Sequence, residues 1–185
     1  MTQVPPWWRV YLEPKPGWDT DDYEEVLKEL EKRPPNRQLL SPILAGFIAG
    51  VVQGNGSLGY LKVLQNPETY TPFTEIKCDV ETLDFIVRQI NDGWGFADRG
   101  GARLVVLGLR CVLLLKIIGP YLRGWKYRAY DAIVANGYKV SGQVLEKILQ
   151  SYELDYGLRT VSIEGKKFRM YVFREKLSKQ GDLKP

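Results

Sequence analysis

The sequence predicts an α+β domain in which helices cover one face of a four-stranded antiparallel sheet. The apolar pattern changes from a helical to an alternating period after Gly54, which predicts that a helix leads into strands. The glycine-rich turn at residues 99–101 predicts a second pair of strands joined as a hairpin. Together these segments follow the order helix, two strands, helix, two strands and helices, which is typical of an antiparallel sheet with helices on one side.

Residues 1–38 form a separate N-terminal region. Prolines and Trp7, Trp8 and Trp18 predict an extended arm that docks on a surface, either of its own domain or of a neighbour. Residues 19–33 follow as an acidic helix that Pro34 ends. From residue 1 to 31 there are eight acidic residues against three basic ones.

Residues 39–155 form the predicted sheet domain. Its first helix begins after Ser41, an N-cap followed by proline at the first turn, and runs to about Gly54. Gly137 is placed to end a later helix. Strands are predicted at residues 57–64, 73–79, 93–98 and 102–108, and helices at 80–91, 109–122, 125–136 and 141–152.

Residues 156–185 form a basic β-hairpin and tail. Two strands, 159–163 and 167–173, flank a turn at residues 164–165, and basic residues alternate there with apolar ones. We expect this hairpin to be an addition to the four-stranded unit.

Composition excludes several classes of protein. The 185 residues include no histidine, which excludes histidine-based acid–base catalysis and the commonest zinc sites. Cys78 and Cys111 lie in apolar runs and are expected to be reduced core residues. No signal peptide is recognised, so secretion is not expected, and charges and glycines interrupt the apolar segment 104–122, so no membrane span is expected.

Basic charge is segregated, although the net charge is only +4. Residues 99–139 carry eight basic residues against one acidic residue, and residues 159–185 carry eight against three. Such segregation is typical of proteins that bind a polyanion, although it is equally compatible with a solubilising surface.

The segment from Leu44 to Leu58, a helix of small residues with a glycine-rich exit, resembles the signature helix of the LAGLIDADG homing endonucleases. The similarity extends over residues 39–133 and includes residues 94–100 and 120–126. It implies an αββαββα unit with a four-stranded sheet. In that family the helix packs against a second copy of itself and ends in acids that hold a divalent metal over DNA.

The resemblance fits this helix in two registers, four residues apart. In the later one Gln53 and Asn55 stand where the two acids are expected, and in the earlier one Ala49 and Val51 do. No aspartate or glutamate occurs between Lys32 and Pro67, whereas Mg²⁺ needs anionic oxygen ligands to support phosphodiester hydrolysis. The resemblance therefore implies an inactive site with no metal or other cofactor, and Lys126 is the only possible catalytic remnant. The alternative is an active homodimeric endonuclease that cuts double-stranded DNA with Mg²⁺.

Small residues leave one side of the predicted helix nearly bare. Glycine inside a helix costs about 1 kcal/mol relative to alanine, a cost that close helix packing offsets. We expect this side to pack on a second copy or on a protein neighbour; packing on the domain's own sheet is the alternative. The predicted packing residues are Ala45, Gly46, Ala49, Gly50 and Gly54.

The sheet face that reads DNA in the family is poor in base-reading side chains here. Its alternating sets are Gly59, Leu61 and Val63 on the first strand and Thr71, Phe73 and Glu75 on the second, with 104–106 on the fourth. Nucleic acid, with RNA favoured over DNA, is instead expected to contact basic and aromatic residues. These are Lys62, Lys77, Arg99, Arg103, Arg123, Trp125, Lys126, Arg128, Lys139, Lys167 and Arg169.

These expectations combine into one functional hypothesis with two alternatives. The chain is expected to be an inactive LAGLIDADG-type protein reused to bind RNA, as a structural subunit of a ribonucleoprotein such as an organellar ribosome or as a splicing cofactor. The family's habitat suggests the mitochondrion or another organelle. The alternatives are the active endonuclease and a protein-binding scaffold, which the apolar sheet face favours.

Overall fold

The structure is a computed structural model that describes residues 41–63, 69–90, 95–98, 103–137, 139–163 and 166–177. The predicted N-terminal arm, the acidic helix and Arg99 lie outside the described residues. The α+β class is confirmed, because the described elements are helices on an antiparallel sheet.

The helices and strands follow the predicted order closely. Ser41 caps the first helix by accepting a hydrogen bond from the backbone N–H of Leu44, and Ser141 caps the last in the same way. The helices are α3 (Pro42–Asn55), α4 (Val80–Ile90), α5 (Gly108–Ile118), α6 (Trp125–Asn136) and α7 (Gly142–Ser151). The strands are β1 (Ser57–Val63), β2 (Tyr70–Lys77), β3 (Gly95–Asp98), β4 (Arg103–Leu107), β5 (Leu154–Ile163) and β6 (Lys166–Glu175).

The helix predicted over residues 109–122 is shorter than expected. It ends as α5 at Ile118, and a 3-10 turn, η3 (Gly119–Tyr121), follows. Pro120 explains the change, because proline has no N–H with which to continue the α-helical hydrogen bonds. None of the described helices is both long and apolar enough to cross a membrane.

The prediction of a four-stranded sheet is wrong, because the C-terminal hairpin extends the sheet to six strands. The strand order is β3-β4-β2-β1-β6-β5. Strand β6 pairs antiparallel with β1, from Gly59 opposite Val172 to Val63 opposite Phe168. The free edge of β1 offers backbone groups that need partners, and β6 satisfies them. The predicted boundary between residues 155 and 156 falls inside β5.

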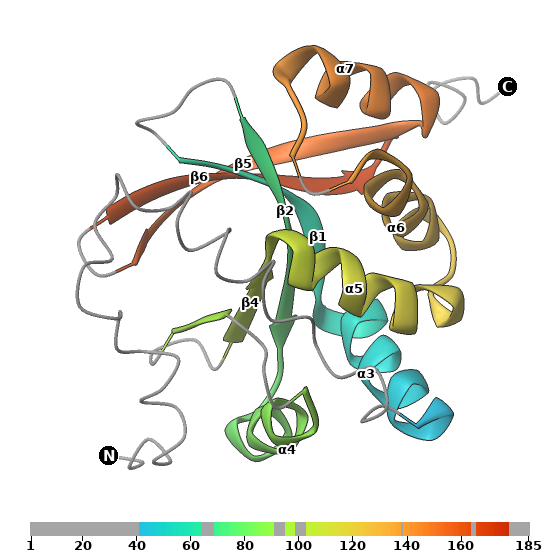
Figure 1. The fold of residues 1–185 in the computed structure, drawn as a ribbon, viewed down its shortest axis with the longest axis vertical. Coiled ribbons are helices and arrows are strands. Elements are labelled where there is room, and N and C mark those ends of the chain that lie inside the picture. The colour runs from blue at the N-terminus through green and yellow to red at the C-terminus, as the bar shows by residue number, and fades with distance from the viewer. Residues whose placement is uncertain are drawn as a thin grey trace, which may run out of the picture.

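The helices cover one face of the sheet and enclose the main core. In Figure 1, α5 lies between α3 and α6 on the same side of the strands. Side chains from α3, from α5 and from alternate positions of the strands are fully buried there. Examples are Ile48, Val52, Leu58, Ile76, Leu115 and Ile118.

The opposite face of the sheet carries a second apolar cluster. It comprises Leu61, Phe73, Val105, Leu107, Phe168 and Met170, all of them buried. The strand register places the expected sets of β1 and β2 on this face. On β4 it places only Val105 of residues 104–106 there, because neighbouring residues in a strand point to opposite faces. Glu75 is buried on this face and forms two salt bridges. Its Oε2 atom lies 3.3 Å from Nη1 of Arg103 and 2.6 Å from Nη2 of Arg159.

Gly59 is required by the β1–β6 pairing. A Cβ atom at this position would overlap the carbonyl oxygen of Tyr171 on β6. We therefore predict that Gly59→Ala lowers the free energy of unfolding by about 1–3 kcal/mol, because the two backbones must move apart. Urea denaturation measures the change.

Gly142→Ala is the matched control for this test. Its added Cβ would make only ordinary contacts, 3.6 Å from the nearest ring atom of Tyr70. It should change stability by no more than about 1 kcal/mol. Equal urea midpoints for Gly59→Ala and Gly142→Ala would contradict the close β1–β6 approach.

Candidate nucleic-acid interface

The C-terminal end of α3 is held by a buried lysine. The ammonium group of Lys126, on α6, donates hydrogen bonds to the carbonyl oxygens of Val52, Gln53 and Gly56 at 2.8, 2.9 and 2.9 Å. Carbonyls at a helix end lack partners within the helix and carry partial negative charge, so a cation stabilises them. The side chain is only 6% exposed, and desolvation by this burial lowers its pKa.

This bonding decides what Lys126 can do. A lysine ammonium group has three N–H donors and no acceptor, and all three donors are used. In this conformation Lys126 therefore has no N–H left for a phosphate, either as a catalytic remnant or as a nucleic-acid contact. Its role in the structure is to cap α3.

Gln53 and Asn55 complete the same junction as neutral amides. The Oε1 atom of Gln53 accepts a hydrogen bond from the backbone N–H of Arg123 at 2.8 Å. The Nδ2 atom of Asn55 donates to the carbonyl oxygen of Lys77 at 3.4 Å. A carboxylate at position 55 has no proton for that carbonyl, so the amide suits the site. Among the described residues, no group of three or more histidine, cysteine, aspartate or glutamate side chains could hold a metal ion.

The basic and aromatic stretch at residues 123–128 also makes internal bonds. Arg123 donates through Nη1 to the carbonyl oxygens of Pro120 and Leu122. Arg128 donates through Nε to the carbonyl oxygen of Tyr152 at 3.1 Å. Trp125 is half-buried against the main core. Much of the hydrogen-bonding capacity of this stretch therefore stabilises the fold.

Two cations of the predicted set are arranged differently. Lys62 on β1 and Arg169 on β6 lie directly opposite each other in the sheet. Within the described part of the chain, neither side chain pairs with a carboxylate. Like charges directly opposite each other destabilise a strand pair. An arrangement that costs stability, and in which no carboxylate of the described residues neutralises either cation, favours an anionic partner at this position.

A tyrosine ladder, defined here as Tyr70, Tyr171 and Tyr156, runs beside these cations. The ring centroids of Tyr70 and Tyr171 are 5.3 Å apart, and those of Tyr171 and Tyr156 are 5.2 Å apart. The Nζ atom of Lys62 lies 5.8 Å from the centroid of the Tyr70 ring. Burial and a hydrogen bond with Tyr171 raise the pKa of Tyr70, so its hydroxyl stays protonated at neutral pH.

The sequence reasoning missed the tyrosine ladder. Its members belong to β2, β5 and β6, far apart in the chain, and only the strand register brings them together. No local spacing signals such a cluster. The one available signal was the tyrosine content of 11 residues, which does not say which rings meet.

The remaining predicted contacts are spread over the molecule. Lys77 is exposed at the end of β2, and Arg103 is bonded to Glu75 on the opposite face. Lys139 is exposed before α7. The backbone of Lys167 lies in β6, but its side chain is outside the described set. The structure therefore brings together Lys62 and Arg169, and it does not gather the whole predicted set.

The predicted packing residues of α3 divide into two groups. Ala45 and Ala49 are buried in the domain's own core. Gly46, Gly50 and Gly54 lie on the other side of the helix, and a Cβ atom added at any of them would meet no atom of the described residues within 4 Å. Beside these glycines, Ile43 and Phe47 are 85% and 45% exposed. The bare glycine side is thus open, and only the alanines pack on the sheet.

No model of a known protein family matches this chain, and no curated protein matches it. The resemblance to the LAGLIDADG family consequently rests on the residues of the chain itself.

We predict that Lys126→Met lowers the free energy of unfolding by about 2–4 kcal/mol, because it removes three hydrogen bonds from the ammonium group to carbonyl oxygens at the end of α3. The carbonyl oxygen of Val52 keeps the backbone N–H of Gly56 as a donor. Urea denaturation measures this loss. Lys116→Met is the matched control, since Lys116 is exposed on α5, and it should change stability by about 0.5 kcal/mol or less. An unchanged urea midpoint for Lys126→Met would show that the cap contributes nothing.

Proposed function

We propose that this chain is a catalytically inactive LAGLIDADG-type protein that binds RNA, as a structural subunit of a ribonucleoprotein such as an organellar ribosome or as a splicing cofactor. The observation that carries the proposal is the opposed pair Lys62 and Arg169, which has no carboxylate partner among the described residues and lies beside the tyrosine ladder. The LAGLIDADG assignment and the organelle follow from the resemblance alone.

The chemistry of this interface favours RNA. Cations bind the phosphate backbone, and tyrosine rings stack on bases that are not held in a duplex. Sequence-specific RNA recognition mostly uses such unpaired bases in loops and single strands. Duplex DNA offers only phosphates and groove edges to the same surface, and the tyrosine ladder has little to bind there.

The active-endonuclease alternative has little support at the end of α3. Mg²⁺-dependent cleavage needs carboxylates that neutralise the metal charge. Gln53 and Asn55 are neutral, and both are engaged in internal hydrogen bonds. Lys126 adds a positive charge at the same junction, which opposes binding of a second cation.

A protein partner on α3 is a compatible second part of the proposal. The open side of α3 combines Gly46, Gly50 and Gly54 with the exposed side chains of Ile43 and Phe47. Glycines allow the backbone of another helix to approach closely, and exposed apolar side chains favour association. The partner is a second copy of this chain or a neighbouring protein.

We predict that replacing both Lys62 and Arg169 by alanine weakens RNA binding roughly tenfold at moderate salt. The salt dependence of log K should also flatten by about 1.4, as expected for two lost phosphate contacts on a single strand. Fluorescence anisotropy with a labelled 20-nucleotide RNA measures both. The stability of the double variant should not fall, because the change removes a like-charge pair.

Lys116→Ala provides the control, since it removes one exposed lysine from α5, a helix that contributes no residue to the Lys62–Arg169 pair or to the tyrosine ladder. Its affinity for the RNA should stay within about twofold of the unmodified protein. Equal affinities for the double variant and for Lys116→Ala would contradict the proposed function.

We predict that the protein self-associates or binds its neighbour through α3, and that Gly50→Leu abolishes this association. The added side chain fills the space that the partner helix would occupy, whereas the described residues leave room for it. Sedimentation velocity over a concentration series measures self-association. If Gly50→Leu leaves the sedimentation behaviour of an associating protein unchanged, α3 is not the contact.

A further inference from the structure

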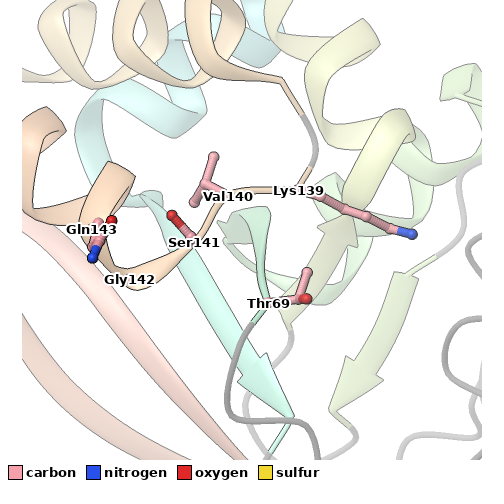
Figure 2. Close-up of a pocket in the computed structure, with 6 residues that line it drawn as sticks. All are labelled: Thr69, Lys139, Val140, Ser141, Gly142 and Gln143. Carbon is pink, nitrogen blue, oxygen red and sulfur yellow. The ribbon is translucent and has the colours of Figure 1, made fainter.

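A hollow lies beside the tyrosine ladder and has no assigned occupant. Thr69 and the segment from Lys139 to Gln143 line it, and its volume is about 600 Å³. Figure 2 shows Ser141 and Gln143 on one side of it and Thr69 and Lys139 on the other. Ligand sites commonly have volumes of about 300–1,000 Å³, and the volume of this hollow falls within that range.

The hollow is continuous with the proposed RNA interface. The backbone N–H of Tyr70 donates a hydrogen bond to the carbonyl oxygen of Val140 at 2.8 Å. The backbone N–H of Val140 donates one to the carbonyl oxygen of Tyr70 at 3.0 Å. Gly142 lies against the ring of Tyr70, because a Cβ atom added at this glycine would be 3.6 Å from the nearest ring atom. Tyr70 therefore belongs both to the wall next to the hollow and to the ladder that leads towards Lys62 and Arg169.

The groups around the hollow suit the edge of a nucleobase. Gln143 is exposed, and its amide offers both a donor and an acceptor. Thr69 adds a hydroxyl group, and Lys139 adds a positive charge at the rim. Such donors and acceptors can each bond to the hydrogen-bonding edge of a base, which is accessible only when the base is unpaired.

The arrangement across the sheet agrees with a single strand. Tyr70, Lys62 and Arg169 occupy opposed positions on the neighbouring strands β2, β1 and β6. Strands are about 4.8 Å apart, so ring and cations form one short row. A chain whose phosphates follow the cations can direct its bases onto the tyrosine rings and into the hollow at the end of the row.

From this geometry we infer that the interface binds an unpaired stretch of RNA, with one nucleobase seated in the hollow lined by Thr69 and residues 139–143. The inference rests on the proposed RNA-binding function and specifies its ligand. The hollow supplies the base contact, and Lys62 and Arg169 supply the phosphate contacts.

The test measures anisotropy with a labelled 12-nucleotide single-stranded RNA and with the same strand annealed into a duplex. Gly142→Leu fills the hollow, and the pair Thr69→Val with Gln143→Leu removes two of its polar groups at similar volume. Both variants should lose roughly tenfold in affinity for the single strand, the scale of one base contact, and should bind the duplex as the unmodified protein does. Lys116→Ala, which changes an exposed residue of α5 that does not line the hollow, is the control and should keep its affinity.

The outcomes separate this inference from the proposed function. If both hollow variants bind the single strand normally while the Lys62 and Arg169 double variant is impaired, the base site is wrong and RNA binding stands. If the duplex binds as tightly as the single strand, the unpaired ligand is wrong. If neither the hollow variants nor the double variant is impaired, the proposed function itself fails. Circular dichroism checks folding, and the Thr69 and Gln143 variant decides the test if Gly142→Leu does not fold.

Discussion

The cap that Lys126 forms on α3 is the interaction on which the arrangement of the domain depends. One ammonium group joins the last turn of α3, the connection into β1 and the start of α6. Strand β1 lies in the middle of the sheet, paired with β2 on one side and β6 on the other. The cap therefore fixes where β1 begins, and with it the positions of Lys62 and its neighbours on both sides.

Neutral side chains at the end of α3 are the counterpart of this cap. Gln53 and Asn55 fasten the helix to the connection before α6 and to the end of β2 by hydrogen bonds that need amide groups. All three side chains of this junction, one cation and two amides, bond to backbone groups of the chain itself. The cations of residues 123–128 share in this internal bonding, whereas Lys62 and Arg169 pair with no carboxylate of the described chain.

The local elements were predictable because their signals are local. Ser41 and Ser141 cap their helices as expected, and Gly137, with a φ of 81°, ends α6 in the left-handed conformation that favours glycine. The six-stranded sheet was not predictable, since the pairing of β6 with β1 joins segments more than 100 residues apart in the sequence. The same limit hid the tyrosine ladder. The same limit also hid the bonding of Lys126. A lysine within a basic stretch is expected to be exposed, and its three acceptors at the end of α3 become apparent only in the folded structure.

The central claim is that RNA binds on the sheet beside the tyrosine ladder and away from the end of α3. Hydrogen–deuterium exchange of the protein with and without a saturating single-stranded RNA tests it most directly. We predict slower exchange at residues 60–62, 69–72, 139–144 and 167–171, with little change at residues 52–56 and 123–128. Protection concentrated at residues 52–56 and 123–128, with none on the strands, would contradict the account and return the nucleic-acid contact to the end of the signature helix.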